Sequence, residues 1–152
     1  MKRLHVVGCH RSGTTLLFEL LTTCFDHDGR CEHEQSIFNP LELPVADDGL
    51  YLSKKPSDTT HIHRIFHADP DLHLIYMLRD PRAVITSIHP SRGDVYFSSF
   101  ERWQRYERAA APLKDHPRFM EVRFEDLVSQ PDTVQSRIEA RFPFLQRRHG
   151  FS

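Results

Sequence analysis

An apolar strand that runs directly into a glycine-bounded loop is the feature that most constrains this chain. Residues 3–9 have the composition of a buried strand, and residues 14–25 follow a helical pattern with leucines along one side. The two glycines of the intervening loop let the backbone curl, so that successive N–H groups point at one anion. The following helix adds unpaired N–H groups and the positive end of its dipole. We therefore expect an oxyanion to bind where the loop meets the helix.

The loop has the glycine spacing of a phosphate-binding loop but lacks the lysine of such loops. It reads Gly8-Cys9-His10-Arg11-Ser12-Gly13-Thr14-Thr15. Thr15 stands where phosphate-binding loops carry Ser or Thr, whereas Thr14 stands where nucleotide-hydrolysing loops carry lysine. Arg11 is the obvious replacement for the missing cation. The sequence thus predicts an oxyanion cradle whose cation lies within the loop.

The rest of the chain alternates between strand and helix patterns. Further strands are predicted at 50–54, 72–78 and 119–124, with a possible short one at 30–33, and residues 38–49 read as a loop. Helices are predicted at about 57–67, 81–88, 96–111 and 132–142. This alternation indicates an α/β fold of three layers, α/β/α, around a central, mostly parallel sheet of about five strands. With 152 residues and no linker, residues 1–152 are expected to form a single domain.

Composition excludes several classes of partner. A net charge of −1 argues against broad binding of nucleic acid or anionic membrane, and no apolar run has the length of a membrane span. The apolar stretch after Met1-Lys2-Arg3 is too short for a signal peptide, so we expect an unprocessed, cytoplasmic chain. Three cysteines fit a reducing compartment, and a zinc site from Cys24, Cys31 and His33 matches no common ligand spacing. No metal is expected.

A second candidate anion site follows the strand predicted at 72–78. Arg79 leaves this strand beside the start of a helix, and Ser87 lies about two turns along that helix. A bidentate guanidinium and a hydroxyl are suited to holding a phosphate. The same Arg-Asp-Pro segment is also typical of an ordinary strand-to-helix corner with a surface ion pair. By itself it leaves both interpretations open.

Together, the two segments resemble the sulfotransferase superfamily, whose enzymes use 3′-phosphoadenosine 5′-phosphosulfate (PAPS). The matching stretches are Arg11-Ser12-Gly13-Thr14-Thr15 and Arg79-Asp80-Pro81-Arg82 with Ser87, supported by Leu52-Ser53-Lys54-Lys55-Pro56 and Val122-Arg123-Phe124-Glu125-Asp126-Leu127. The resemblance implies a P-loop type fold in which the first stretch binds the 5′-phosphosulfate, while Arg79 and Ser87 hold the 3′-phosphate. It covers roughly residues 4–131 and is closer to the carbohydrate and bacterial branches than to the cytosolic phenol branch.

The resemblance also implies a base that takes the proton of the acceptor. Related branches place a glutamate after the second strand, where this chain has Glu32, His33 and Glu34. Glu34 is the first choice, Glu32 the second and His33 the third, and a solvated charged turn is the alternative for each. Arg11 would stabilise charge on the leaving phosphate, with Lys54 or Lys55 assisting. The two lysines could equally be an exposed strand end.

The expected reaction is therefore sulfuryl transfer from PAPS to a hydroxyl or amine of a carbohydrate or small molecule, with 3′-phosphoadenosine 5′-phosphate (PAP) as product. The alternatives are a P-loop small-molecule kinase and a non-catalytic relative that binds PAPS or PAP. Relatives usually continue into a glycine- and basic-rich loop over the 3′-phosphate, where this chain has only Arg147, Arg148 and Gly150. The C-terminal part thus looks short or truncated, and a homo-oligomer is one way to complete the site.

Overall fold

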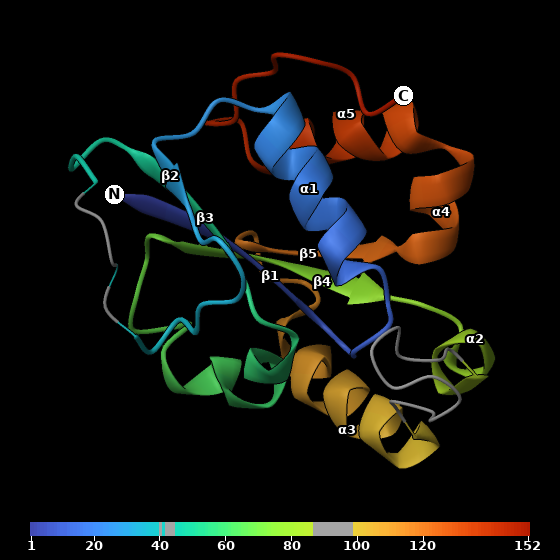
Figure 1. Ribbon diagram of the computed structural model, residues 1–152. Coiled ribbons are helices and arrows are strands. Elements are labelled where there is room, and N and C mark those ends of the chain that lie inside the picture. Colours follow the sequence, from blue (N-terminus) through green and yellow to red (C-terminus); the bar gives the residue numbers. More distant parts are fainter. Residues whose placement is uncertain (40, 42–44, 87–98) are drawn as a thin grey trace.

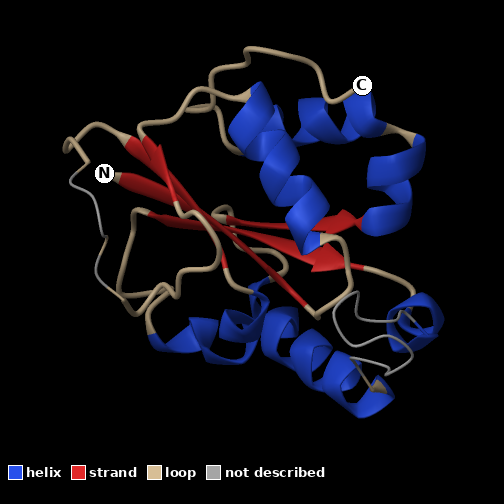
Figure 2. Cartoon of the chain, viewed as in Figure 1, coloured by secondary structure: helices blue, strands red, loops and turns tan. Residues whose placement is uncertain are grey.

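Five parallel strands form the centre of the molecule (Figure 2), and their spatial order is β2-β3-β1-β4-β5. This computed structural model describes residues 1–39, 41, 45–86 and 99–152 (Figure 1). The strands are β1 (Lys2–Gly8), β2 (Gly29–Arg30), β3 (Leu50–Lys54), β4 (Leu72–Leu78) and β5 (Phe119–Arg123). The predicted parallel sheet is confirmed, including both bounds of the strands at 50–54 and 72–78.

Helices cover both faces of the sheet, which confirms the three-layer architecture (Figure 1). One face carries α1 (Thr14–Cys24), α4 (Phe124–Ser129) and α5 (Pro131–Arg141). The opposite face carries the 3-10 helix η1 (Pro56–Arg64) and α3 (Phe100–Ala110), which continues into the short η2 (Ala111–Leu113). The short helix α2 (Pro81–Thr86) packs beside α3.

β1 is the central strand, and its position explains its composition. It pairs with β3 on one side and with β4 on the other, and residues 3–8 are all buried. Leu4 and Val6 pack in the core below α1, whereas Val7 packs in the core on the η1 and α3 face. Because all the strands are parallel, the loops after β1, β3, β4 and β5 emerge at one edge of the sheet, where such folds bind ligands.

Two elements differ from the prediction, and hydrogen bonds account for each difference. The helix predicted at 57–67 is the 3-10 helix η1, in which the hydroxyls of Thr59 and Thr60 donate to carbonyls three residues earlier. Such side-chain bonds compete with regular helical bonding. The strand predicted at 30–33 is only Gly29–Arg30, because the chain bends at 32–33 before the N–H of Gln35 bonds to Lys54 O at 3.1 Å.

The remaining elements agree with the predictions apart from their ends. β5 stops one residue early, and α3 begins at Phe100, where the Ser99 hydroxyl accepts the N–H of Arg102 at 3.1 Å. The residues predicted to begin this helix, 96–98, lie outside the described residues, as does the predicted end of the helix at 81–88. Among the helices of the described ranges, none combines the length and apolar character needed to cross a bilayer.

Candidate active site

The loop after β1 depends on both of its glycines. Gly8 has φ 143°, and a Cβ there would lie 2.7 Å from the carbonyl oxygen of Met77. Gly13 has φ 88°, and its Cβ would lie 2.4 Å from the Phe124 ring. Arg11 is the one non-glycine residue with positive φ, 70°, among the described residues. The curl of the loop is therefore built from backbone conformations that ordinary side chains disfavour.

The loop delivers an open helix N-terminus to the edge of the sheet. α1 starts at Thr14, directly after Gly13, with no side-chain cap and no acidic residue in its first turn. An anion is therefore the natural partner for its first N–H groups. Ser12 is only 1% exposed, and its hydroxyl has no hydrogen-bond partner within the described part of the chain. A buried hydroxyl without a partner is typical of a site that is completed by a ligand.

Arg79 is the first residue after β4, and it packs onto this loop. Its Nη1 donates to the carbonyl oxygen of Arg11 at 2.9 Å, and its guanidinium lies 4.2 Å from the centre of the Phe124 ring. A cavity of about 240 Å³ lies here, lined by Arg11, Gly13, Thr14, Thr15, Arg79 and Phe124. The structure thus brings together all the residues expected to bind the donor except two. Ser12 is buried and does not line this cavity, and Ser87 lies outside the described residues.

The two candidate lysines have different surroundings. Lys54 ends β3 with 8% exposure, and its Nζ donates to Thr15 Oγ1 at 2.9 Å. The same Nζ lies 3.8 Å from Glu34 Oε1. Lys55 instead stands at the N-cap of η1, where its backbone N–H bonds to Val6 O and its carbonyl accepts from Asp58. Of the pair, Lys54 is the residue that joins the anion-binding loop.

The candidate bases line a neighbouring cavity that shares Thr15 with the first. It has a volume of about 270 Å³ and is lined by Thr15, Phe18, Glu19, Arg30, Glu32, His33, Glu34 and Lys54. Glu34 is the carboxylate that reaches Lys54, whereas Glu32 and His33, which precede it in the chain, line other parts of the cavity wall. Arg30 packs its guanidinium 4.8 Å from the Phe18 ring centre and pairs with Glu19 at 3.1 Å. The cavity wall is therefore polar, with one aromatic face.

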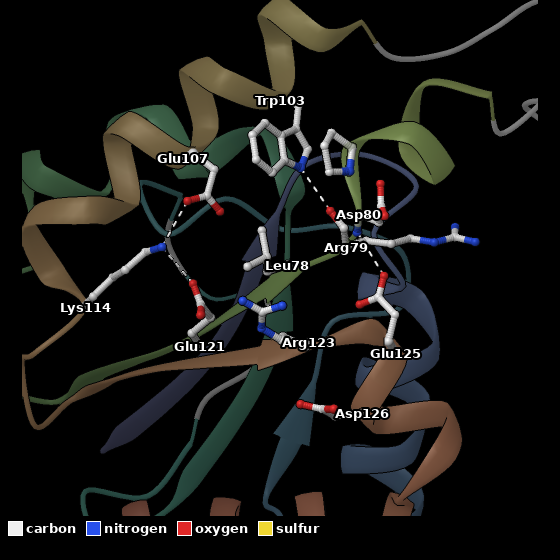
Figure 3. A pocket seen from close by; sticks show the side chains of 11 residues that line it. Leu78, Arg79, Asp80, Trp103, Glu107, Lys114, Glu121, Arg123, Glu125 and Asp126 are labelled. Atoms are coloured by element: carbon white, nitrogen blue, oxygen red, sulfur yellow. Dashed lines mark hydrogen bonds and ion pairs between the residues drawn. The ribbon is translucent and has the colours of Figure 1, made fainter.

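A larger cavity of about 570 Å³ lies at the ends of β4 and β5, below α3 (Figure 3). Lys114 bridges Glu107 and Glu121 at 2.9 Å each, and these two carboxylates raise the pKa of the lysine against the opposing effect of burial. In Figure 3 the Arg79 side chain points away from Lys114 and its two glutamates. The cavity thus adjoins the backbone of Arg79, while the Arg79 guanidinium contacts the loop after β1 on the other side.

Two bonds at this cavity fix the corner that carries Arg79 (Figure 3). The indole N–H of Trp103 donates to the Arg79 carbonyl at 3.0 Å, and the N–H of Asp80 donates to Glu125 Oε1 at 2.9 Å. Glu125 lies in the first turn of α4, which has no side-chain cap, and its carboxylate holds this corner. Asp80 instead caps α2 and pairs with Arg82, which holds the pKa of Asp80 at about 2.

Sequence reasoning missed a buried polar cluster beneath the candidate bases. His5 is fully buried in β1, with Nε2 2.9 Å from Asp58 Oδ2 and Nδ1 2.7 Å from Ser53 Oγ. Burial lowers the pKa of His5. Burial would raise the pKa of Asp58, but hydrogen bonds from His5, Ile37 and Ser36 outweigh it and leave that pKa below its usual value. The available signal was the alternation of Arg3 and His5 on one face of an otherwise apolar strand.

The chemistry of the site is that of anions and protons. Across residues 1–39, 41, 45–86 and 99–152, no three His, Cys, Asp or Glu side chains are grouped as metal ligands would be. The three cysteines are buried free thiols. The geometry offers N–H groups, hydroxyls and two cations in two cavities that share Thr15, with Arg79 in the first and Lys54 and Glu34 in the second.

Comparisons with known proteins agree with this chemistry. A family model described as the sulfotransferase family matches residues 43–143. No curated protein matches the chain. Among solved structures, the sulfotransferase domain of the Synechococcus PCC 7002 olefin synthase is similar at a TM-score of 0.65 and 19% identity, over 92% of this chain and 72% of that one.

Two further solved structures have the same fold. The sulfotransferase domain of the curacin biosynthetic pathway has a TM-score of 0.67 and 18% identity, over 93% of this chain and 74% of that domain. Mouse sulfotransferase SULT7A1, complexed with PAP, has a TM-score of 0.64 and 14% identity, over 94% of this chain and 58% of the mouse chain. At these identities the similarity concerns the fold.

Proposed function

The chain belongs to the sulfotransferase family, and we propose that it transfers the sulfuryl group of PAPS to a hydroxyl or amine of a carbohydrate or small molecule. The acceptor oxygen or nitrogen forms a bond to sulfur, and the bond from sulfur to the 5′-phosphate oxygen breaks. The acceptor proton goes to a protein base, and PAP leaves with the electron pair of the broken bond. The expected catalytic requirements are positioning and charge neutralisation.

One observation carries the proposal. The ammonium of Lys54 lies between the anion-binding loop and a carboxylate, 2.9 Å from Thr15 Oγ1 and 3.8 Å from Glu34 Oε1. A cation at this point can neutralise charge that develops on the bridging oxygen while a base operates beside it. We assign Glu34 as this base, because Glu32 and His33 line the same cavity without the contact to Lys54.

The donor site is proposed along the first cavity. The N–H groups from Gly13 to Thr15 and the hydroxyls of Thr14 and Thr15 would hold the 5′-phosphosulfate, with Arg11 supplying charge. Arg79 and Ser87 would hold the 3′-phosphate. The contact of Arg79 with the loop supports the role proposed for Arg79. Its guanidinium is fixed beside the cradle before any ligand binds, so little side-chain entropy remains to be lost.

The second cavity is proposed to take the acceptor. Its wall carries the charged side chains of Glu19, Arg30 and Glu32 beside one aromatic ring. Hydroxyl-rich acceptors can form several hydrogen bonds to such groups, whereas a phenol offers them a single hydroxyl. This polarity supports a carbohydrate or polar small molecule as the acceptor.

The direct test is nucleotide binding followed by transfer. Calorimetry should show binding of PAP without metal, and ATP with Mg²⁺ should bind weakly or not at all. Incubation with PAPS and a panel of carbohydrates, small alcohols, amines and phenols should then release PAP, detected by chromatography. Binding of ATP with Mg²⁺ but not of PAP would indicate a kinase instead. Binding of PAP without release from PAPS on the whole panel would indicate a non-catalytic relative.

A further inference from the structure

We propose that Arg3, His5, Ser36, Ser53 and Asp58 form a buried positioning network that holds Glu34 against Lys54. This proposal rests on the proposed transfer reaction and names residues outside both site cavities. All five side chains are at least nine-tenths buried. They come from β1, β3, η1 and the segment after Glu34, and so tie together the elements that meet beneath the site.

The hydrogen bonds of the network run in one direction. Arg3 Nε donates to Ser53 Oγ at 2.8 Å, which leaves the Ser53 proton for His5 Nδ1 at 2.7 Å. His5 Nε2 then donates to Asp58 Oδ2 at 2.9 Å. This order requires a neutral imidazole protonated on Nε2, and burial, which lowers the pKa of His5, favours the neutral form.

Arg3 and Asp58, at the two ends of the network, hold the backbone that follows Glu34. Arg3 Nη2 donates to the carbonyls of Gln35 at 3.4 Å and Ser36 at 3.2 Å. Asp58 accepts the Ser36 hydroxyl at 2.8 Å and the Ile37 N–H at 2.9 Å. Residues 35–37 are therefore held from two sides, at their carbonyls and at their N–H and hydroxyl groups.

The same segment is bonded to the strand that carries Lys54. The N–H of Gln35 donates to the carbonyl of Lys54 at 3.1 Å, and the Gln35 side chain accepts the Tyr51 hydroxyl. Ser53 of the network directly precedes Lys54 in β3. Glu34 directly precedes the bonded residue Gln35, and Lys54 directly follows the bonded residue Ser53. These bonds therefore set the separation of 3.8 Å between the Glu34 carboxylate and the Lys54 ammonium.

These residues act through Glu34 and Lys54 and do not touch the reacting groups. None of the five lines either site cavity. Packing alone does not require them, because apolar side chains of similar volume avoid the desolvation cost of a buried Arg, His and Asp. A fully satisfied polar network adds a fixed geometry that apolar packing does not enforce. Fixed geometry is what a base and a cation at one reaction centre need.

The test removes one hydroxyl at the edge of the network. Ser36→Ala deletes the hydroxyl that donates to Asp58 and accepts the N–H of Phe38 while leaving β1, β3 and η1 intact, and Ser36→Thr restores a hydroxyl. Ser129→Ala is the matched control, because it removes a serine hydroxyl that bonds a carbonyl on the exposed helix α4. Three readouts are compared with the wild type: amide hydrogen exchange of residues 31–38, modification of Lys54 relative to Lys55, and PAP release from PAPS.

In Ser36→Ala we expect exchange in 31–38 to quicken by about tenfold, because the bond to Asp58 is lost. The informative amides are those other than Phe38, whose N–H loses its own acceptor in this variant. Modification of Lys54 by an amine-reactive ester should rise relative to its neighbour Lys55, which serves as the internal reference. The kcat for PAP release should fall by about tenfold while the KM for PAPS and the Kd for PAP change less than about twofold. Ser36→Thr should recover kcat, and Ser129→Ala should match the wild type in all three readouts.

Two results would overturn the network. One is unchanged exchange and an unchanged Lys54 to Lys55 ratio in Ser36→Ala, and the other is full turnover despite both changes. A wild-type protein that binds PAP but never releases it from PAPS would refute the transfer reaction and with it the catalytic purpose of the network. The exchange and modification readouts would still decide, in that case, whether the five residues fix Glu34 and Lys54.

Discussion

Lys54 is the residue whose surroundings say most about the reaction. It is the last residue of β3, an interior strand of the sheet. The direction of its side chain is therefore set by the pleat of that strand and by the Thr15 hydroxyl, which accepts a hydrogen bond from it. A flexible lysine is normally costly to immobilise. Here the position in β3 and the bond to Thr15 already restrict the side chain, so the ammonium lies at a fixed point between the loop and the base. Lys55, one position later, begins η1.

The first prediction separates these two lysines. Lys54→Met removes the ammonium but keeps most of the side-chain volume, and we expect kcat for PAP release to fall by about 10²–10³, as for loss of one fixed electrostatic group. Lys55→Met should stay within about threefold of the wild type, since its side chain has no part in the loop contact. Steady-state kinetics with PAPS measure both, and equal losses in the two variants would contradict the assignment.

The second prediction concerns the base. Glu34→Gln keeps the shape of the side chain but removes its ability to take a proton, so turnover should fall by about 10²–10⁴ while PAP binding is retained. Glu32→Gln is the matched control from the same cavity, and we expect a change of less than about fivefold. Should Glu32→Gln be the damaging change, the base is Glu32 and the contact with Lys54 is not catalytic.

The third prediction tests Arg79 against another arginine of the same segment. Arg79→Lys loses the planar group that donates to Arg11 O and lies over Phe124, so the Kd for PAP should rise by about tenfold or more. Arg82→Lys is a suitable control, because Arg82 is 90% exposed and pairs with Asp80 on the surface. Calorimetric titration with PAP distinguishes the two, and equal weakening would indicate a general charge effect.

At the scale of elements, the sequence predicts what local spacing determines. The strand at 72–78, the loop from Gly8 to Thr15 and the helix after it follow from apolar runs and glycine spacing, and the structure contains them. The bend after β2 and the 3-10 form of η1 could not be predicted in this way. They depend on hydrogen bonds between groups that become neighbours only through folding. The Thr59 hydroxyl accepts the N–H of Gly8, and the N–H of Gln35 donates to the carbonyl of Lys54.

The fourth prediction tests the loop as an element. Gly13→Ala places a Cβ 2.4 Å from the Phe124 ring at φ 88°, so the loop must shift and the ring with it. We expect loss of PAP binding and a free energy of unfolding lower by about 1–3 kcal/mol. Gly150→Ala is the control, since its Cβ meets nothing nearer than 3.8 Å. Normal PAP binding by Gly13→Ala would show that the loop geometry is not needed for the anion.

At the scale of the whole molecule, the site is assembled from segments far apart in the chain. Arg11, Lys54 and Arg79 each lie at or just after the end of a different strand, and the parallel order of the sheet brings them to one edge. Such convergence follows from chain topology alone, because parallel strands end at the same edge of a sheet. The sequence did not predict the partners of His5, since Ser53 and Asp58 lie about fifty residues away and only the register of β1 with β3 aligns them.

The buried network also makes the stability of the whole fold depend on pH. The pKa of His5 is lower in the folded protein than in the unfolded chain, because burial disfavours the charged imidazole. The unfolded chain therefore binds a proton that the folded protein does not, so stability is complete above about pH 6.5 and decreases as the pH falls below that value. The lowered pKa of Asp58 acts in the same direction at lower pH, where protonation of the carboxylate removes its stabilising bonds.

The fifth prediction is that a substitution at His5 flattens this dependence. His5→Gln cannot titrate, so the slope of unfolding free energy against pH between about 6 and 4.5 should decrease by up to about 1.4 kcal/mol per pH unit, the contribution of one proton. The slope is diagnostic even where the variant is less stable overall. The pKa values of His73 and His116 are also lowered, so His116→Gln is the comparison for a histidine outside the network. Denaturant unfolding across this pH range measures all three proteins. An identical slope for His5→Gln and the wild type would show that His5 is protonated in the folded protein. That result would contradict the proposed order of hydrogen bonds, in which His5 is neutral.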